Sequence, residues 1–85
     1  MRSVVIFKEE TDYARQVYDY LRDFERQTGR ELATMDPESQ EGVSFCLTYD
    51  ILEFPTVVAL ADDGRMLNQW KGLSLPTISE VSYYV

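Results

Sequence analysis

The first third of the chain combines one continuous apolar run with one long amphipathic pattern. Residues 4–7 (VVIF) are all apolar and rich in β-branched side chains, which is typical of a strand buried on both faces of a sheet. Apolar side chains then recur every three or four positions over residues 14–24, which predicts a helix. Thr11 or Asp12 is the expected N-cap, and Gly29 is expected to end the helix. The apolar positions of this helix are Ala14, Val17, Tyr18, Leu21 and Phe24.

The middle of the chain predicts a second strand and a second helix. Residues 31–35 are expected to form a strand, and because a helix separates it from the first strand, the two should pair in parallel. Asp36 is the predicted N-cap of the next helix, with Pro37 in its first position. This helix of about ten residues is expected to end near Asp50. Its inner stripe is predicted to contain Gly42, Phe45, Cys46 and Tyr49.

The last third of the chain predicts a hairpin followed by a terminal helix. Residues 56–61 and 66–70 are two largely apolar runs, and the Asp63-Gly64 pair between them is a strong hairpin signal. After a loop at 71–75, Pro76 fits the first position of a short helix whose inner face includes Ile78 and Val81. The order of elements is therefore strand, helix, strand, helix, strand, strand, helix.

Length and charge exclude several classes of protein. A chain of 85 residues fits one domain, and 45% hydrophobic residues suffice for a core. The formal net charge of −7, with basic residues scattered singly, disfavours nucleic acids and anionic membranes as partners. The longest apolar run, of about six residues, is too short to cross a bilayer, and we expect a cytoplasmic protein. The single cysteine cannot form an internal disulfide.

This order of elements, with a proline directly before the third strand, resembles the thioredoxin-like superfamily. The residues that carry the resemblance are Met35-Asp36-Pro37, the segment 49–56 (YDILEFPT), Asp63-Gly64 and Trp70-Lys71-Gly72. The resemblance covers residues 1–85 and implies a single α/β domain, a thioredoxin-like βαβαββα fold with a four-stranded mixed sheet and helices on both faces. It also implies a cis peptide bond before Pro55, with the backbone of Phe54 free to pair with an extended peptide.

The chain departs from this family at the redox motif. Thioredoxins carry C-x-x-C at the start of the first helix because a thiolate at a helix N-terminus attacks disulfides. By count from the flanking elements, that place falls on Asp12-Tyr13-Ala14-Arg15, which holds no thiol. The glutathione-binding pattern of glutaredoxins is absent too, since Phe54-Pro55-Thr56 is not followed by G-G-x-D. Asp12 and Arg15 are thus degenerate motif positions, and we expect a redox-inactive protein without a cofactor.

Cys46 admits two interpretations. Its place on the inner stripe of the second helix favours an inert core cysteine, because free cysteine is among the most buried residue types. The alternative is a redox protein or sensor that acts through this single thiol. No metal site is expected, since the sequence has no histidine, no cysteine pair and no calcium-loop spacing.

The segment Phe54-Pro55-Thr56 is the favoured binding site. The sequence hypothesis places it in a shallow groove walled by the loops at 8–12 and 71–75, where an extended peptide could add backbone hydrogen bonds. Tyr13, Tyr20 and Tyr83 lie off the apolar stripes and are expected to be partly exposed. The leading hypothesis is a non-catalytic module that binds a protein, a peptide or a second copy of itself. A structural subunit of a larger assembly is a third hypothesis.

Overall fold

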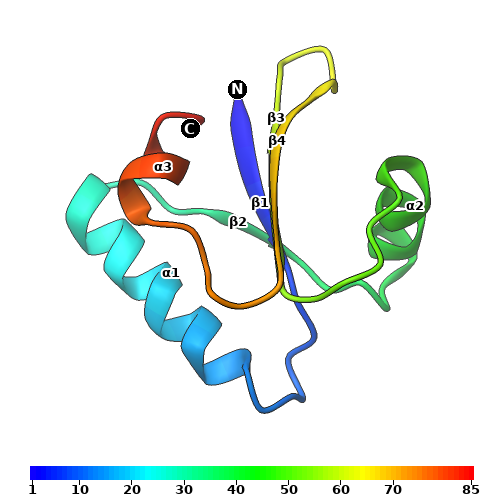
Figure 1. Cartoon of the computed structure of the whole chain (residues 1–85), viewed down its shortest axis with the longest axis horizontal. Coiled ribbons are helices and arrows are strands. Elements are labelled where there is room, and N and C mark those ends of the chain that lie inside the picture. The colour runs from blue at the N-terminus through cyan, green and yellow to red at the C-terminus, as the bar shows by residue number, and fades with distance from the viewer.

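The order of helices and strands predicted from the sequence is confirmed. A computed structural model describes residues 1–85 and contains four strands and three helices (Figure 1). In chain order they are β1 (Arg2–Ile6), α1 (Ala14–Thr28), β2 (Ala33–Met35), α2 (Gln40–Tyr49), β3 (Thr56–Leu60), β4 (Met66–Lys71) and α3 (Ile78–Ser82). No helix is long and apolar enough to span a bilayer.

The strands form one mixed sheet in the order β2-β1-β3-β4. β1 pairs in parallel with β2, with Val5 opposite Thr34, and pairs antiparallel with β3, with Val5 opposite Val57. β3 and β4 form the predicted antiparallel hairpin, and the register shifts between Ala59 and Leu60. The two most apolar strands, β1 and β3, are therefore the central ones, as expected of runs that are apolar on both faces.

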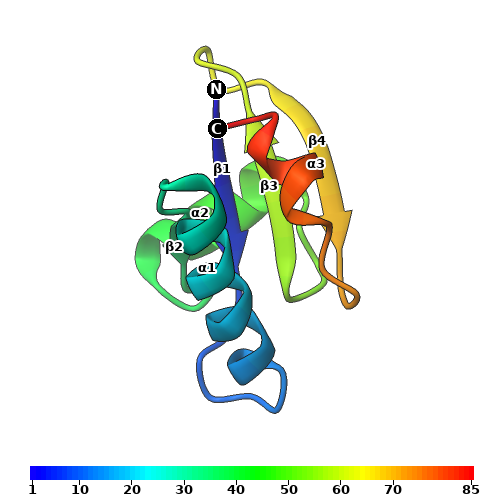
Figure 2. The same ribbon diagram turned by 90° about the vertical axis from the view of Figure 1, so that its left-hand side faces the viewer.

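Helices cover both faces of the sheet, with α1 and α3 on one side and α2 on the other (Figures 1 and 2). Successive strand residues point to opposite faces, so the core has two halves. Val5 and Val57 pack with Phe24 of α1 and Val81 of α3, whereas Val4 and neighbouring side chains pack under α2. Cys46, Phe45 and Tyr49 form the side of α2 that contacts this second half, which confirms the predicted stripe.

The first helix begins later than the sequence predicts. Its N-cap is Tyr13, and no side chain caps it, so the predicted capping roles of Thr11 and Asp12 were wrong. The hydroxyl of Thr11 donates instead to the carbonyl of Lys8 (2.7 Å), and the Ala14 N–H donates to the Thr11 carbonyl (3.2 Å). These bonds form a turn before the helix, and this turn displaces the helix start. The predicted end is confirmed, because Gly29 has φ +73° and its N–H donates to the carbonyl of Glu25.

One of the tyrosines, Tyr18 of α1, is more exposed than the sequence pattern predicts. Tyr18 was expected on the inner face but is 47% exposed, and its ring packs against Phe7 with 5.5 Å between centroids. The expected partial exposure of Tyr13, Tyr20 and Tyr83 is confirmed: the first two are half-buried against the core, and Tyr83 is 73% exposed. Burial raises the pKa of Tyr20 to about 12, with a smaller contribution from the charge of Glu80.

The N-cap of α2 is Ser39 rather than Asp36. The Ser39 hydroxyl accepts a hydrogen bond from the Gly42 N–H (3.0 Å). The Asp36 carboxylate accepts one from the Glu38 N–H (2.8 Å) and so closes the turn before the helix. The predicted end near Asp50 is confirmed, because Asp50 adopts a left-handed conformation with φ 56°.

The last helix, α3, also starts later than predicted, with Ile78 instead of Pro76 in its first position. Pro76 lies before the helix, and the N-cap is Thr77, which forms a capping box with Glu80. The predicted inner face is confirmed, because Val81 is fully buried and Ile78 packs against the same half of the core.

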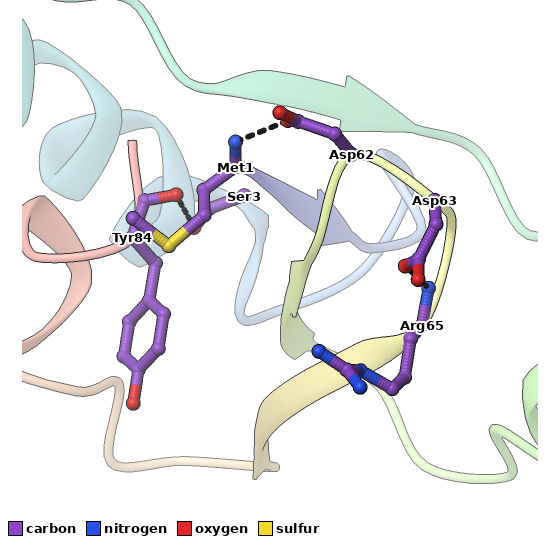
Figure 3. A network of polar contacts seen from close by, with 6 residues as sticks. All are labelled: Met1, Ser3, Asp62, Asp63, Arg65 and Tyr84. Carbon is purple, nitrogen blue, oxygen red and sulfur yellow. Dashed lines mark hydrogen bonds and ion pairs between the residues drawn. The ribbon is translucent and has the colours of Figure 1, made fainter.

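Both ends of the chain are tied to the sheet. Figure 3 shows the N-terminal ammonium group paired with Asp62 in the β3–β4 hairpin, and this pairing lowers the pKa of Asp62. The hydroxyl of Ser3 donates to the carbonyl of Tyr84 (3.5 Å), which links the start of β1 to the C-terminal segment (Figure 3).

Candidate functional site

The four residues at the expected motif position lie at the start of α1. Asp12 and Arg15 are exposed, and Ala14 is buried in the core. Tyr13 folds back over the preceding loop, where its hydroxyl accepts a hydrogen bond from the Lys8 N–H (3.0 Å). None of these four side chains carries a thiol.

The Phe54–Thr56 segment enters β3 through a cis Phe54–Pro55 peptide bond. Pro55 and Thr56 are buried. The Pro55 carbonyl accepts from the Gly72 N–H (2.7 Å), and the Thr56 hydroxyl donates to the Glu53 carbonyl (2.6 Å). The backbone N–H and carbonyl of Phe54 make no hydrogen bond within the chain.

An apolar hollow of about 270 Å³, here called the α2 hollow, lies beside Phe54. Leu47 on α2 and Leu52 after it are 79% and 82% exposed, and Val43 on the same side of α2 is also exposed. The α2 hollow is lined by Lys8, Pro37, Glu38, Val43, Cys46, Leu47, Asp50, Ile51, Leu52 and Phe54. Exposed apolar side chains gathered around a concave surface are typical of contact sites for other molecules.

This hollow is not the groove that the sequence analysis expected. Phe54 and Lys8 line it, as the hypothesis required, but its opposite wall is α2 instead of the loop at 71–75. The periodicity that predicts the inner stripe of α2 leaves the outer face of this helix unassigned. Glu41 is the only charged residue in the helix, and Val43 and Leu47 lie off the stripe, so an apolar outer face could have been recognised.

A polar hollow adjoins the α2 hollow and shares Lys8 and Glu38 with it. The other residues around it are Glu9, Glu10, Thr11 and Asp36. The single cation, Lys8, has its ammonium group 5.6 Å from the centre of the Phe54 ring. The apolar surface is therefore bordered on one side by carboxylates.

Cys46 lies between the core and the α2 hollow. It is half-buried and contacts the second half of the core, and it also lines the hollow. Burial raises the pKa of its thiol above the ordinary value, so little thiolate forms at neutral pH. No three side chains of the His, Cys, Asp or Glu types are grouped in a way that could hold a metal ion.

The sheet order, the helices on both faces and the proline before β3 define a thioredoxin-like fold. The chain is similar in structure to thioredoxin 1 from the thermophilic eubacterium Thermosipho africanus TCF52B, with a TM-score of 0.67 and 14% sequence identity. The superposition covers 99% of this chain and 89% of that protein. No family model and no curated protein matches the sequence. At this identity the likeness shows the fold alone.

Proposed function

We propose that this chain is a non-catalytic thioredoxin-like module that binds another polypeptide at the α2 hollow. The observation that carries the proposal is the exposure of Leu47 and Leu52 around a concave apolar surface. Next to that surface, the unpaired backbone of Phe54 offers a donor and an acceptor to an extended segment.

Charge defines the chemistry of the partner. Four carboxylates, those of Glu9, Glu10, Asp36 and Glu38, surround the polar hollow that adjoins the apolar one. A segment with apolar side chains followed by Lys or Arg fits both hollows at once, because complementary charges steer the encounter and fix the register. A second copy of this chain fits poorly, since it would carry the same acidic border and a net charge of −7.

The redox alternative is weaker because the only thiol is that of Cys46, whose pKa is raised by burial. We expect a thiol reagent at neutral pH to modify Cys46 in the native protein at least about tenfold more slowly than free cysteine. The same measurement in guanidinium chloride should restore the rate of an exposed thiol. A native rate equal to that of free cysteine would favour the redox alternative.

The binding proposal is tested with two synthetic peptides that share the same leucine-containing centre. One peptide carries Lys at its flanks and the other carries Glu, and binding is followed by amide chemical shifts of the labelled protein. We expect the Lys peptide to bind on the order of tenfold more tightly at low salt and to lose this advantage as salt increases. The largest shifts are expected at Val43, Leu47 and Leu52.

Matched leucine substitutions locate the site. Leu47→Asp and Leu52→Asp should each lower the affinity for the Lys peptide on the order of tenfold. Both variants should stay folded, because both side chains are exposed. Leu73→Asp is the control, since Leu73 is also exposed but does not line the α2 hollow. Loss of binding in the Leu73 variant alone would contradict the α2 hollow and favour a groove at the 71–75 loop.

A further inference from the structure

A third hollow lies on the other face of the sheet, between β4 and α3. Its volume is about 230 Å³, and it is lined by Asn68, Trp70, Glu80, Tyr83 and Tyr84. The Tyr84 ring is the central wall, with its centroid 5.7 Å from that of Trp70 and 5.0 Å from that of Tyr83. The interplanar angles are 68° and 82°, so the Tyr84 ring stands at a steep angle to each of the other two rings.

The central wall is held in place although it lies next to the C-terminus. The Asn68 side-chain amide donates to the hydroxyl of Tyr84 (3.4 Å), and the Tyr84 N–H donates to the carbonyl of Val81 (2.9 Å). The Ser3 hydroxyl donates to the Tyr84 carbonyl, as Figure 3 shows. These contacts fix both the backbone and the ring of Tyr84, so this wall of the hollow exists before a ligand arrives.

Glu80 supplies a fixed negative charge at the edge of the hollow. One oxygen of its carboxylate accepts from the hydroxyl (2.9 Å) and the N–H (3.2 Å) of Thr77. These hydrogen bonds lower the pKa of Glu80, so the carboxylate is ionised at neutral pH. No cation of the chain neutralises the rings, because the one cation–π contact in the structure joins Lys8 to Phe54 on another part of the surface.

We propose that this hollow binds an N-methylated ammonium group, such as trimethylammonium. The faces of Trp and Tyr rings attract cations, and the Glu80 charge adds to that attraction. A primary ammonium group would need hydrogen-bond acceptors for its three N–H donors. One Glu80 oxygen already accepts from Thr77, and the Asn68 amide N–H groups are donors, so few acceptors remain. A trimethylammonium group has no N–H donor and places its methyl groups against the rings.

Trp70 is the only tryptophan in the chain, so its fluorescence reports directly on the hollow. The wild-type protein is titrated with choline and with 3,3-dimethylbutan-1-ol, which has the same shape without the charge. We expect choline to bind on the order of tenfold more tightly than the neutral alcohol. The methyl protons of choline should also shift upfield, because they lie over aromatic rings.

Two variants test the contributions of the Glu80 charge and of an aromatic ring to choline binding, and a third is the control. Glu80→Gln removes the charge but keeps the capping box, because Gln also serves at that position. This variant should bind choline several-fold more weakly. Tyr83→Ala removes an exposed wall and should have a similar effect. Tyr18→Ala, at an exposed tyrosine on α1, should leave choline binding unchanged.

Two sources could supply such a group, and peptides distinguish them. If a trimethyllysine peptide binds more tightly than choline and its unmodified lysine counterpart does not bind, the ligand is a methylated protein side chain. If choline binds and the peptide does not, the ligand is a free small molecule. Equal affinity for choline and the neutral alcohol, or choline binding unchanged in both the Glu80 and the Tyr83 variants, would overturn the proposal.

Discussion

Gly42→Ala is expected to lower the free energy of unfolding by about 3 kcal/mol, the upper end of ordinary overpacking costs. A Cβ atom at Gly42 would lie 1.8 Å from the Asp36 carbonyl oxygen and 2.9 Å from the Pro37 Cα, and both are backbone atoms. The Asp36 carbonyl cannot withdraw easily, because it accepts hydrogen bonds from the N–H (3.1 Å) and the hydroxyl (2.7 Å) of Ser39. A domain of this size has a total stability of about 4–13 kcal/mol, so the loss is a large fraction of it.

Urea unfolding of the wild type and the variant measures this loss. Gly29→Ala is the matched control, because a Cβ there would meet nothing within 4 Å and only the φ of +73° opposes it. Its cost should be about 1 kcal/mol. Equal costs at the two glycines would show that α2 tolerates displacement from the turn at Asp36. Since α2 forms the wall of the α2 hollow opposite Phe54, the Gly42 variant should also bind the Lys peptide more weakly.

The order of elements could be predicted because the strong patterns are local. Residues 4–7 are continuously apolar, and they include most of β1, a strand with sheet neighbours on both sides. The Asp63-Gly64 pair lies in the turn between β3 and β4, where Gly64 has φ +89°. In both places the local conformation by itself explains which residue types are found there, so a short stretch of sequence is enough to predict it.

The helix starts could not be predicted equally well, because several residues compete for each N-cap. Asp12 and Asp36 are good capping residues by type, yet Tyr13 and Ser39 occupy the N-caps. Hydrogen bonds in the preceding turns decide the outcome, for example that from the Glu38 N–H to Asp36. Such bonds depend on where the strand before the turn ends, which the sequence pattern does not specify within a residue or two.

The candidate site was predicted in part. The sequence pointed to Phe54, Pro55 and Thr56, and Phe54 does line a concave surface. The other wall was missed because it depends on how α2 crosses the sheet, and this crossing leaves Leu47 exposed. The hollow between β4 and α3 could not be predicted either. Trp70 and Tyr84 are distant in sequence and become neighbours only when α3 packs against the sheet.

Phe24→Ala and Tyr18→Ala should differ widely in cost, although the sequence pattern places both aromatic side chains on the inner face of α1. Phe24 is fully buried between α1 and the sheet, so its truncation leaves a cavity and should cost about 3–5 kcal/mol. Tyr18 is half-exposed and packs with its ring edge-on to that of Phe7, a contact type worth about 0.5–1.5 kcal/mol. Urea unfolding compares the two variants with the wild type, and the Phe24 variant should be unfolded or close to it at 37 °C. Similar costs for the two variants would mean that α1 is rotated about its axis relative to the structure described here, with Tyr18 in the core.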